Sequence, residues 1–175
     1  MKRLLLLRHA KAVTNSTDSD HARALAPRGR SAAPLVGRAM RAKGYIPDLV
    51  LCSGARRTTE TWELVAPELK AKPKSEITEA LYLAPWNAIL KRVREVPDSV
   101  GTVLVVGHNP GLEDCAAALL KPAADGPERK RREAMAEKFS TGALAVLDCG
   151  IDHWSLLAPR TAALATFLRP RDLAD

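Results

Sequence analysis

The most informative segment of the sequence is Leu4-Leu5-Leu6-Leu7-Arg8-His9. Four consecutive leucines followed by polar residues are typical of a strand that is buried on both faces, as the strands of a parallel sheet are. The strand would bring a histidine beside a guanidinium to the edge of the sheet. An imidazole placed there is suited to attacking a phosphoryl group.

Further apolar runs predict more strands of the same sheet, with helices between them. The strands are expected at 49–52, 103–106 and 143–147, and a last one at 154–157 is expected to pair after a turn at 150–152. The helices are expected at 28–43, 55–69, 87–96 and 112–120. Gly44 suits the end of the first helix, and Pro67 predicts a break near the end of the second. This alternation predicts a three-layer α/β/α fold, with a mostly parallel central sheet and helices on both faces.

The composition predicts one soluble domain that attracts anions. The 175 residues fit a single domain over 1–175, and lysine plus arginine exceed aspartate plus glutamate by 7. Phosphorylated small molecules and acidic proteins are therefore candidate ligands. No aromatic stacking platform accompanies the basic residues, so we expect no specific nucleic-acid partner. Apolar runs are too short for a signal peptide or a membrane span, and we expect no membrane association.

The three cysteines are expected to be core residues. They lie inside apolar segments and lack a short Cys-x-x-Cys spacing, which argues against a zinc cluster and against a disulfide framework. We therefore expect a cytoplasmic protein in a reducing environment. These residues are Cys52, Cys115 and Cys149.

Two more strand ends carry residues that suit a phosphate site. The strand at 103–106 runs into Gly107-His108-Asn109-Pro110-Gly111, and the strand at 49–52 runs into Ser53, an expected helix cap, and then Arg56-Arg57. Because ligands collect outside the carboxyl ends of strands in α/β sheets, the three loops can converge. Helical spacing does not decide which of the two arginines faces the site.

These segments together resemble the histidine phosphatase superfamily, also called the phosphoglycerate mutase-like family, and within it the SixA-type phosphohistidine phosphatases. Leu7-Arg8-His9-Ala10-Lys11-Ala12 looks like the family signature, with alanine where many members have glycine after the histidine. The segments at 53–61 and 106–110 resemble its arginine and second-histidine motifs, and 138–145 resembles the start of a late strand. The resemblance implies His9 as the phosphoacceptor, a phosphate pocket of Arg8, Arg57 and His108, and no metal or other cofactor.

Other site residues are less strongly indicated. The segment 20–25 resembles the stretch before the first helix of SixA-like chains, which makes Arg23 a candidate phosphate contact. Asn15 follows Arg8-His9 at the spacing at which members of the mutase branch have a phosphate-binding asparagine, although the residues between differ from that pattern. The general acid is left open among Asp20, Glu79 and Glu113. A phosphohistidine substrate relaxes the need for one, because imidazole leaves as a base with a pKa of roughly 6.5.

The remaining polar residues are interpreted as structural. Arg56 is expected on the surface of its helix, His21 in a loop and His153 in a turn. The basic run at 129–132 is interpreted as a solvated loop or helix face, and a docking patch for an acidic partner is the alternative.

The sequence thus predicts a phosphatase that forms a covalent phosphohistidine on His9. Its substrate would be a phosphohistidine-bearing protein or a phosphorylated small molecule. A phosphoglycerate mutase ranks lower, because the short stretch between Thr61 and Glu79 leaves little room for the insertion that carries the acid in such enzymes. The alternative from another class is a non-catalytic binding protein that holds phosphorylated or other acidic ligands in a basic pocket.

Overall fold

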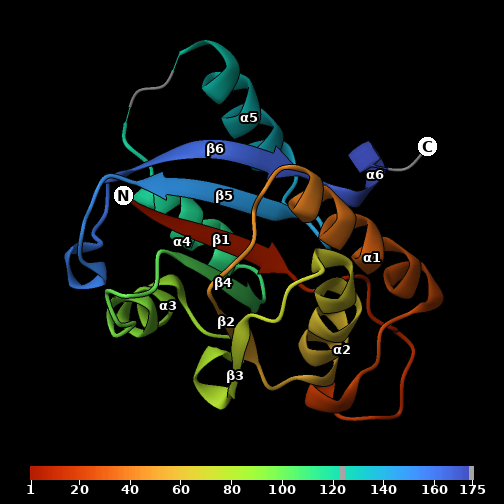
Figure 1. The fold of residues 1–175 in the computed structure, drawn as a ribbon. Helices are drawn as coiled ribbons and strands as arrows, with labels where there is room; N and C mark the ends of the chain where they lie inside the picture. The colour runs from red at the N-terminus through yellow and green to blue at the C-terminus, as the bar shows by residue number, and fades with distance from the viewer. Residues whose placement is uncertain (123–124, 174–175) are drawn as a thin grey trace.

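A six-stranded mixed sheet organises the computed structural model, which describes residues 1–122 and 125–173 (Figure 1). The strand order is β3-β2-β4-β1-β5-β6. The first four of these strands run parallel to one another, and β5 is antiparallel to both β1 and β6. The strands are β1 (Lys2–Arg8), β2 (Leu49–Ser53), β3 (Lys74–Thr78), β4 (Thr102–Gly107), β5 (Leu144–Cys149) and β6 (Ala162–Leu168).

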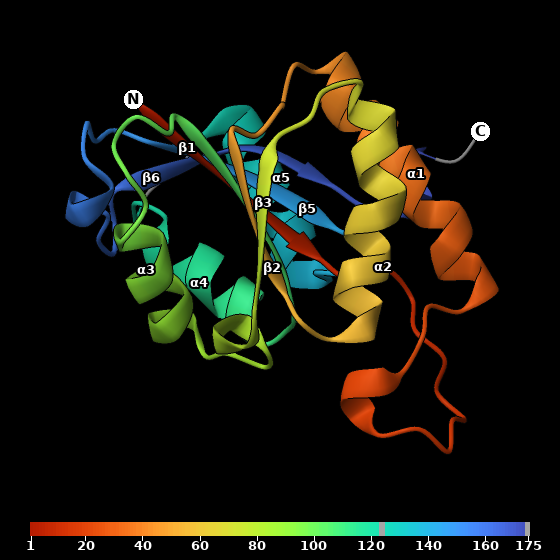
Figure 2. The ribbon, with the colours of Figure 1, turned by 60° about the horizontal axis from the view of Figure 1, so that its bottom comes forward.

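Helices cover both faces of the sheet. Figure 2 shows α1 and α2 on one face and α3 and α4 on the other. Within the described residues, no helix has both the length and the apolarity that a bilayer-spanning segment requires. The α-helices are α1 (Pro27–Ala42), α2 (Arg56–Val65), α3 (Trp86–Arg94), α4 (Gly111–Leu119), α5 (Gly126–Glu137) and α6 (Pro170–Leu173). Short 3-10 turns are η1 (Asp20–Ala22), η2 (Ala66–Leu69), η3 (Glu79–Leu81) and η4 (Trp154–Leu156).

The leucine run of β1 shows how one strand supports two cores. Leu4 and Leu6 pack into the cluster beneath α3 and α4, whereas Leu5 and Leu7 pack into the cluster beneath α1 and α2. All four side chains are completely buried, because β1 lies between β4 and β5 and is covered from both sides. The three-layer α/β/α architecture expected from the alternation of strands and helices is confirmed.

Two strands differ from the prediction. The strand expected at 154–157 is wrong: Trp154 begins the turn η4, is fully buried, and donates its indole N–H to the carbonyl of Val100 at 2.7 Å. The partner of β5 is β6, which begins at Ala162. The edge strand β3 was not predicted, because its sequence Lys74–Thr78 is polar and largely exposed.

The direction of the strands brings six segments to one edge of the sheet. The carboxyl ends of β1, β2, β3 and β4 meet there, since these strands are parallel. Because β5 is antiparallel to β1, the loop that precedes it starts at the same edge, and β6, antiparallel to β5, ends there. A ligand site is therefore expected at this edge, because ligands bind outside the carboxyl ends of the strands in α/β sheets.

Candidate active site

His9 follows β1 directly and is held by backbone contacts on both sides. Its N–H donates to the carbonyl of Gly107 at 3.1 Å, and the next amide, that of Ala10, donates to Thr61 Oγ1 at 3.0 Å. The ring nitrogen Nδ1 lies 2.8 Å from the carbonyl oxygen of Ala10. Because a carbonyl oxygen only accepts, Nδ1 carries the proton, and Nε2 keeps a free lone pair in the neutral ring. Burial lowers the pKa of this imidazole to about 3.

His108 follows β4 and is fixed through both ring nitrogens. Nε2 lies 2.8 Å from Ser53 Oγ, and Nδ1 lies 3.3 Å from a terminal nitrogen of Arg57. Since a guanidinium only donates, Nδ1 is the acceptor and Nε2 donates to the serine. Burial, followed by the charge of Arg57, lowers the pKa of His108 to about 4. The predicted role of Ser53 as a helix cap is wrong, because α2 is capped at Ala55 and the serine hydroxyl bonds to the histidine.

Arg57 is the buried member of the arginine pair at the start of α2. It is 2% exposed, and its terminal nitrogens donate to the backbone carbonyl of Asp20 at 2.7 Å and to the carboxylate of Asp20 at 3.0 Å. Asp20 also accepts a hydrogen bond from the hydroxyl of Tyr82. That bond, with those from Arg23 and Arg57, holds the pKa of the Asp20 carboxyl well below its usual range. The carboxylate of Asp20 therefore contacts the guanidinium of Arg57 in the absence of a ligand.

Arg8 ends β1 and extends toward the loop before β5. One terminal nitrogen donates to the carbonyl of Phe139 at 3.0 Å. The Nε atoms of both Arg8 and Arg57 are buried and lack an acceptor among the described residues. Unsatisfied guanidinium donors of this kind are costly unless an anion completes their hydrogen bonding.

One cavity of about 330 Å³, at the carboxyl edge of the sheet, is lined by all four residues of the expected phosphate site: Arg8, His9, Arg57 and His108. The ring centroids of His9 and His108 are 5.4 Å apart. Within the described ranges, no group of three or more histidine, cysteine, aspartate or glutamate side chains is arranged to hold a metal ion. The cavity is lined by Arg8, His9, Lys11, Ala12, Thr14, Asp20, Arg23, Arg57, Leu83, His108, Asn109 and Thr141.

The less strongly indicated residues differ in position. Arg23 lines the cavity, but its nitrogens donate to Asp20 Oδ1 and to the carbonyl of Val13. Asn15 is exposed and does not line the cavity, whereas the adjacent Thr14 does.

Of the three acid candidates, only Asp20 lines the cavity. Glu79 is exposed and pairs with His21 at 2.9 Å. Glu113 lies in the first turn of α4, where its backbone N–H donates to Asn109 Oδ1. Because Asp20 is held as a carboxylate by its neighbours, it has no proton to donate in this arrangement.

The residues interpreted as structural lie outside the cavity. Arg56 is 55% exposed and pairs with Glu60, and His153 pairs with Asp98. His21 lies in η1 with its ring against Tyr82. The basic run at 129–132 belongs to α5, where Arg132 pairs with Glu128 and Arg131 donates to a carbonyl of β6.

Sequence reasoning missed two contributors to the site. Ser53 lies in the quoted arginine motif, but nothing in that motif shows that its hydroxyl reaches a histidine 55 positions away. Tyr82 has no motif of its own. Its ring packs edge-on against His108 with centroids 5.6 Å apart, and its hydroxyl bonds to Asp20. Only the parallel pairing of β2 with β3 and β4 brings these residues together.

Comparison with known proteins places this geometry in context. Residues 4–82 match the family model of the histidine phosphatase superfamily (branch 1). An uncharacterized protein of Mycobacterium tuberculosis is 36% identical over 165 residues, which is 94% of this chain and 100% of that protein. A structure from Nakamurella multipartitia, provisionally identified as the phosphohistidine phosphatase SixA, superposes with a TM-score of 0.80 at 32% identity, covering 97% of this chain and 96% of that one. A second, from Agrobacterium tumefaciens and provisionally given the same identification, has a TM-score of 0.79 at 28% identity, covering 97% and 98%.

Proposed function

The chain belongs to the histidine phosphatase superfamily, branch 1, and on that premise we propose that it removes the phosphoryl group from phosphohistidine on a protein. It is a metal-independent phosphatase, a hydrolase whose chemistry depends on histidine. Two solved structures that resemble it, at 32% and 28% identity, are both provisionally identified as phosphohistidine phosphatases, which supports this substrate class.

The observation that carries the proposed mechanism is the fixed tautomer of His9. Its proton is held on Nδ1 by the carbonyl of Ala10, so the lone pair of Nε2 is available at neutral pH. In the first step, Nε2 forms a bond to phosphorus while the bond from phosphorus to the substrate ring breaks. The substrate ring, which carries a proton on its other nitrogen, keeps the released electron pair and leaves as neutral imidazole, and His9 keeps its own proton on Nδ1. In the second step, water attacks the phosphohistidine on His9, and inorganic phosphate and the free imidazole are produced.

Arg8, Arg57 and His108 would stabilise the charge that spreads over the equatorial oxygens. The unsatisfied Nε donors of the two arginines support this role. A phosphoryl group that bonds to the terminal nitrogen of Arg57 now donating to Asp20 would displace that carboxylate. Once the guanidinium turns to the phosphoryl group, Nδ1 of His108 loses its donor. The nearby negative charge then favours a protonated imidazole that can donate to a phosphoryl oxygen.

The leaving group explains why this site needs no strong acid. A phosphohistidine ring that carries a proton on its other nitrogen departs as neutral imidazole, whose conjugate acid has a pKa of roughly 6.5, so the departing nitrogen itself needs no proton from the enzyme, whereas an alkoxide does. Asp20, the acid candidate that lines the cavity, is held ionised by Tyr82, Arg23 and Arg57. This difference favours phosphohistidine over alkyl phosphate esters such as sugar phosphates.

A substrate panel tests the proposal. The wild-type protein and His108→Ala would be assayed for phosphate release from a phosphohistidine peptide, an aryl phosphate, a sugar phosphate and a nucleotide. We expect the highest kcat/KM on phosphohistidine, measurable turnover of the aryl phosphate, and a loss of about 10²-fold or more on both in the variant. A sugar phosphate that outranks phosphohistidine would contradict the substrate class. Silence on every compound would favour a binding protein instead.

Two further properties are part of the proposal. One sheet with cores on both faces supports a single domain over the whole chain. The three cysteines are buried and free, which supports residence in the reducing cytoplasm.

A further inference from the structure

A second cavity of about 620 Å³ adjoins the catalytic one and is rich in cationic side chains. The two cavities share Arg8, Lys11 and Thr141, so a group bound in one lies next to the other. We call the second cavity the cationic groove. It lies between the first turns of α1, the loop that precedes β5, and α6, and no described acidic residue lines it. It is lined by Arg8, Lys11, Arg28, Ser31, Ala32, Leu35, Lys138, Ser140, Thr141, Arg169, Pro170 and Arg171.

Four of its six cations are not neutralised by the protein. Within residues 1–122 and 125–173, Arg8, Lys11, Arg28 and Lys138 form no ion pair with a carboxylate, whereas Arg169 and Arg171 each pair with Glu137 and Asp172. Arg169 lines the groove, and its Nη1 atom is buried without a hydrogen-bond acceptor among the described residues, 4.0 Å from Glu137 Oε1.

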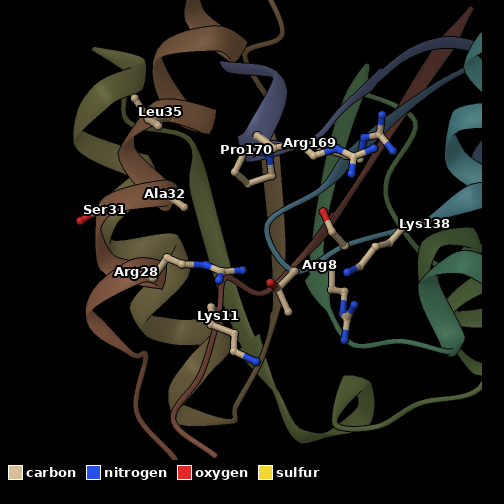
Figure 3. Close-up of a pocket in the computed structure, with 12 residues that line it drawn as sticks. Arg8, Lys11, Arg28, Ser31, Ala32, Leu35, Lys138, Arg169 and Pro170 are labelled. Atoms are coloured by element: carbon tan, nitrogen blue, oxygen red, sulfur yellow. The ribbon is translucent and has the colours of Figure 1, made fainter. Parts of the chain in front are cut away.

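Figure 3 shows the cations on opposite walls of the groove. The side chains of Arg28 and Lys11 extend from one side and that of Lys138 from the other, toward the space between them, and Arg8 lies on the same side as Lys138. Ala32, Leu35 and Pro170 form an apolar part of the lining. The four unpaired cations come from three separate segments of the chain, and this arrangement suits several negative groups along a polypeptide better than one compact anion.

We propose that the cationic groove binds acidic residues that flank the phosphohistidine of the substrate protein. This inference rests on the proposed function, because phosphohistidine is presented by a polypeptide. When the phosphoryl group is bound in the catalytic cavity, the part of the substrate next to it lies at Lys11 and Thr141, which line both cavities. That part is then a neighbouring segment of the same polypeptide. A polypeptide supplies both the carboxylates for the cations and the aliphatic side chains for the apolar lining.

The basic run of α5 is a poorer site for the same partner. Arg129 and Arg132 are paired with Glu133 and Glu128, and neither lines either cavity at the catalytic edge. This run therefore provides a control of equal charge. Arg129 and Lys130 are exposed and can be reversed without touching the groove.

The experiment compares two phosphohistidine peptides of equal length, one with acidic and one with neutral flanking residues. The ratio of their kcat/KM values would be measured for the wild type, for Arg28→Glu/Lys138→Glu and for Arg129→Glu/Lys130→Glu. We expect the wild type to prefer the acidic peptide by about tenfold at low ionic strength, with the preference lost at high salt. The groove variant should lose or invert the preference, and the α5 variant should keep it.

An unchanged preference in the groove variant, or an equal loss in both variants, would overturn the proposal. Equal loss would mean that net charge alone selects the substrate. A small bisphosphate would be assayed as an inhibitor beside the peptides. If Arg28→Glu/Lys138→Glu weakened inhibition by the bisphosphate but left kcat/KM for the acidic peptide unchanged, the groove would bind a small polyanion and the polypeptide proposal would be wrong.

Failure of the substrate assignment has a different signature. If the wild type hydrolyses an aryl phosphate but neither peptide, phosphohistidine is not the substrate. The groove is then tested by inhibition of aryl phosphate hydrolysis with an unphosphorylated acidic peptide. Inhibition that weakens in the groove variant and not in the α5 variant would support acidic-polypeptide binding, and no inhibition would overturn it.

Discussion

At the scale of single residues, the free enzyme keeps two imidazoles neutral next to two guanidiniums. Burial, with the positive charge of Arg57, lowers the pKa of both His9 and His108. The cost of burying these rings is limited because each places its proton on a defined acceptor, the carbonyl of Ala10 or the hydroxyl of Ser53. A nucleophile that is already deprotonated needs no separate base.

The pH dependence of activity follows from these shifts. The acidic limb of kcat/KM reports protonation of the nucleophile His9, whose pKa is about 3 in the free enzyme, so activity should fall only below about pH 5. An unperturbed histidine would place it near pH 6.5. Because the rings are neighbours, the apparent values belong to the pair. The assay is kcat/KM for an aryl phosphate from pH 3.5 to 8, corrected for substrate ionisation, and an inflection near 6.5 would contradict this prediction.

The lowered pKa values of His9 and His108 also make the stability of the fold depend on pH. Above a pH of about 6.5 both imidazoles are neutral in the folded and unfolded chains, and they contribute no pH dependence. As the pH falls from there toward the folded pKa values, the unfolded chain binds the extra protons, and the free energy of unfolding decreases. Phosphate binding should reduce this sensitivity, because an anion raises both folded pKa values.

Ser53 is predicted to position His108. Ser53→Ala removes the acceptor of Nε2–H in a fully buried environment, and kcat/KM should fall by about tenfold or more through loss of one buried hydrogen bond. The imidazole ¹⁵N shifts of His108 would also report a changed tautomer, which a purely structural effect elsewhere would not produce. Ser75→Ala, at an exposed position of β3, is the matched control. Unaltered kinetics and unaltered shifts would contradict the role of Ser53.

At the scale of elements, the sequence predicted those parts whose pattern is local. β1, β2 and β4 are apolar runs, and α1 ends before Gly44, whose φ of +75° suits a left-handed C-terminal position. The break predicted from Pro67 is confirmed by the change from α2 to η2. The edge strand β3 has no apolar pattern to detect, because it is paired on one side and exposed.

The sites that long-range pairing creates could not be predicted in this way. Choosing Arg57 over Arg56 required the family resemblance, since both lie in the first turn of α2 and only packing buries one of them. The link between Tyr82 and Asp20 joins segments 62 positions apart and depends on the sheet order. Periodicity also misassigned Trp154, because an apolar run can be buried as a turn as well as a strand.

The close approach of α1 to the loop after His9 gives a prediction at this scale. A Cβ on Gly29 would lie 2.1 Å from the carbonyl oxygen of Lys11, a backbone atom that cannot move alone. Gly29→Ala should therefore lower the free energy of unfolding by about 1–3 kcal/mol. Chemical denaturation would measure it, with Gly150→Ala as the control because a Cβ there meets nothing within 4 Å. Equal stability of the two variants would show that α1 does not approach the loop this closely.

At the scale of the whole molecule, one topological feature assembles both the catalytic cavity and the cationic groove. Four parallel strands bring their carboxyl ends to one edge, and the reversal at β5 places the loop that precedes it there as well. The end of β6 adds the cations that follow it. With a formal net charge of +7, the molecule attracts anions, and this edge is where unneutralised cations meet a nucleophile.

Trapping the covalent intermediate tests the central claim most directly. The wild-type protein would be mixed with a ³²P-labelled phosphohistidine peptide, quenched in alkaline denaturant within milliseconds, and the labelled site identified by mass spectrometry. We expect one base-stable, acid-labile phosphoryl group on His9, absent from His9→Ala and present in Arg129→Glu/Lys130→Glu. Label that persists in His9→Ala, or that maps to another residue of the wild type, would contradict it.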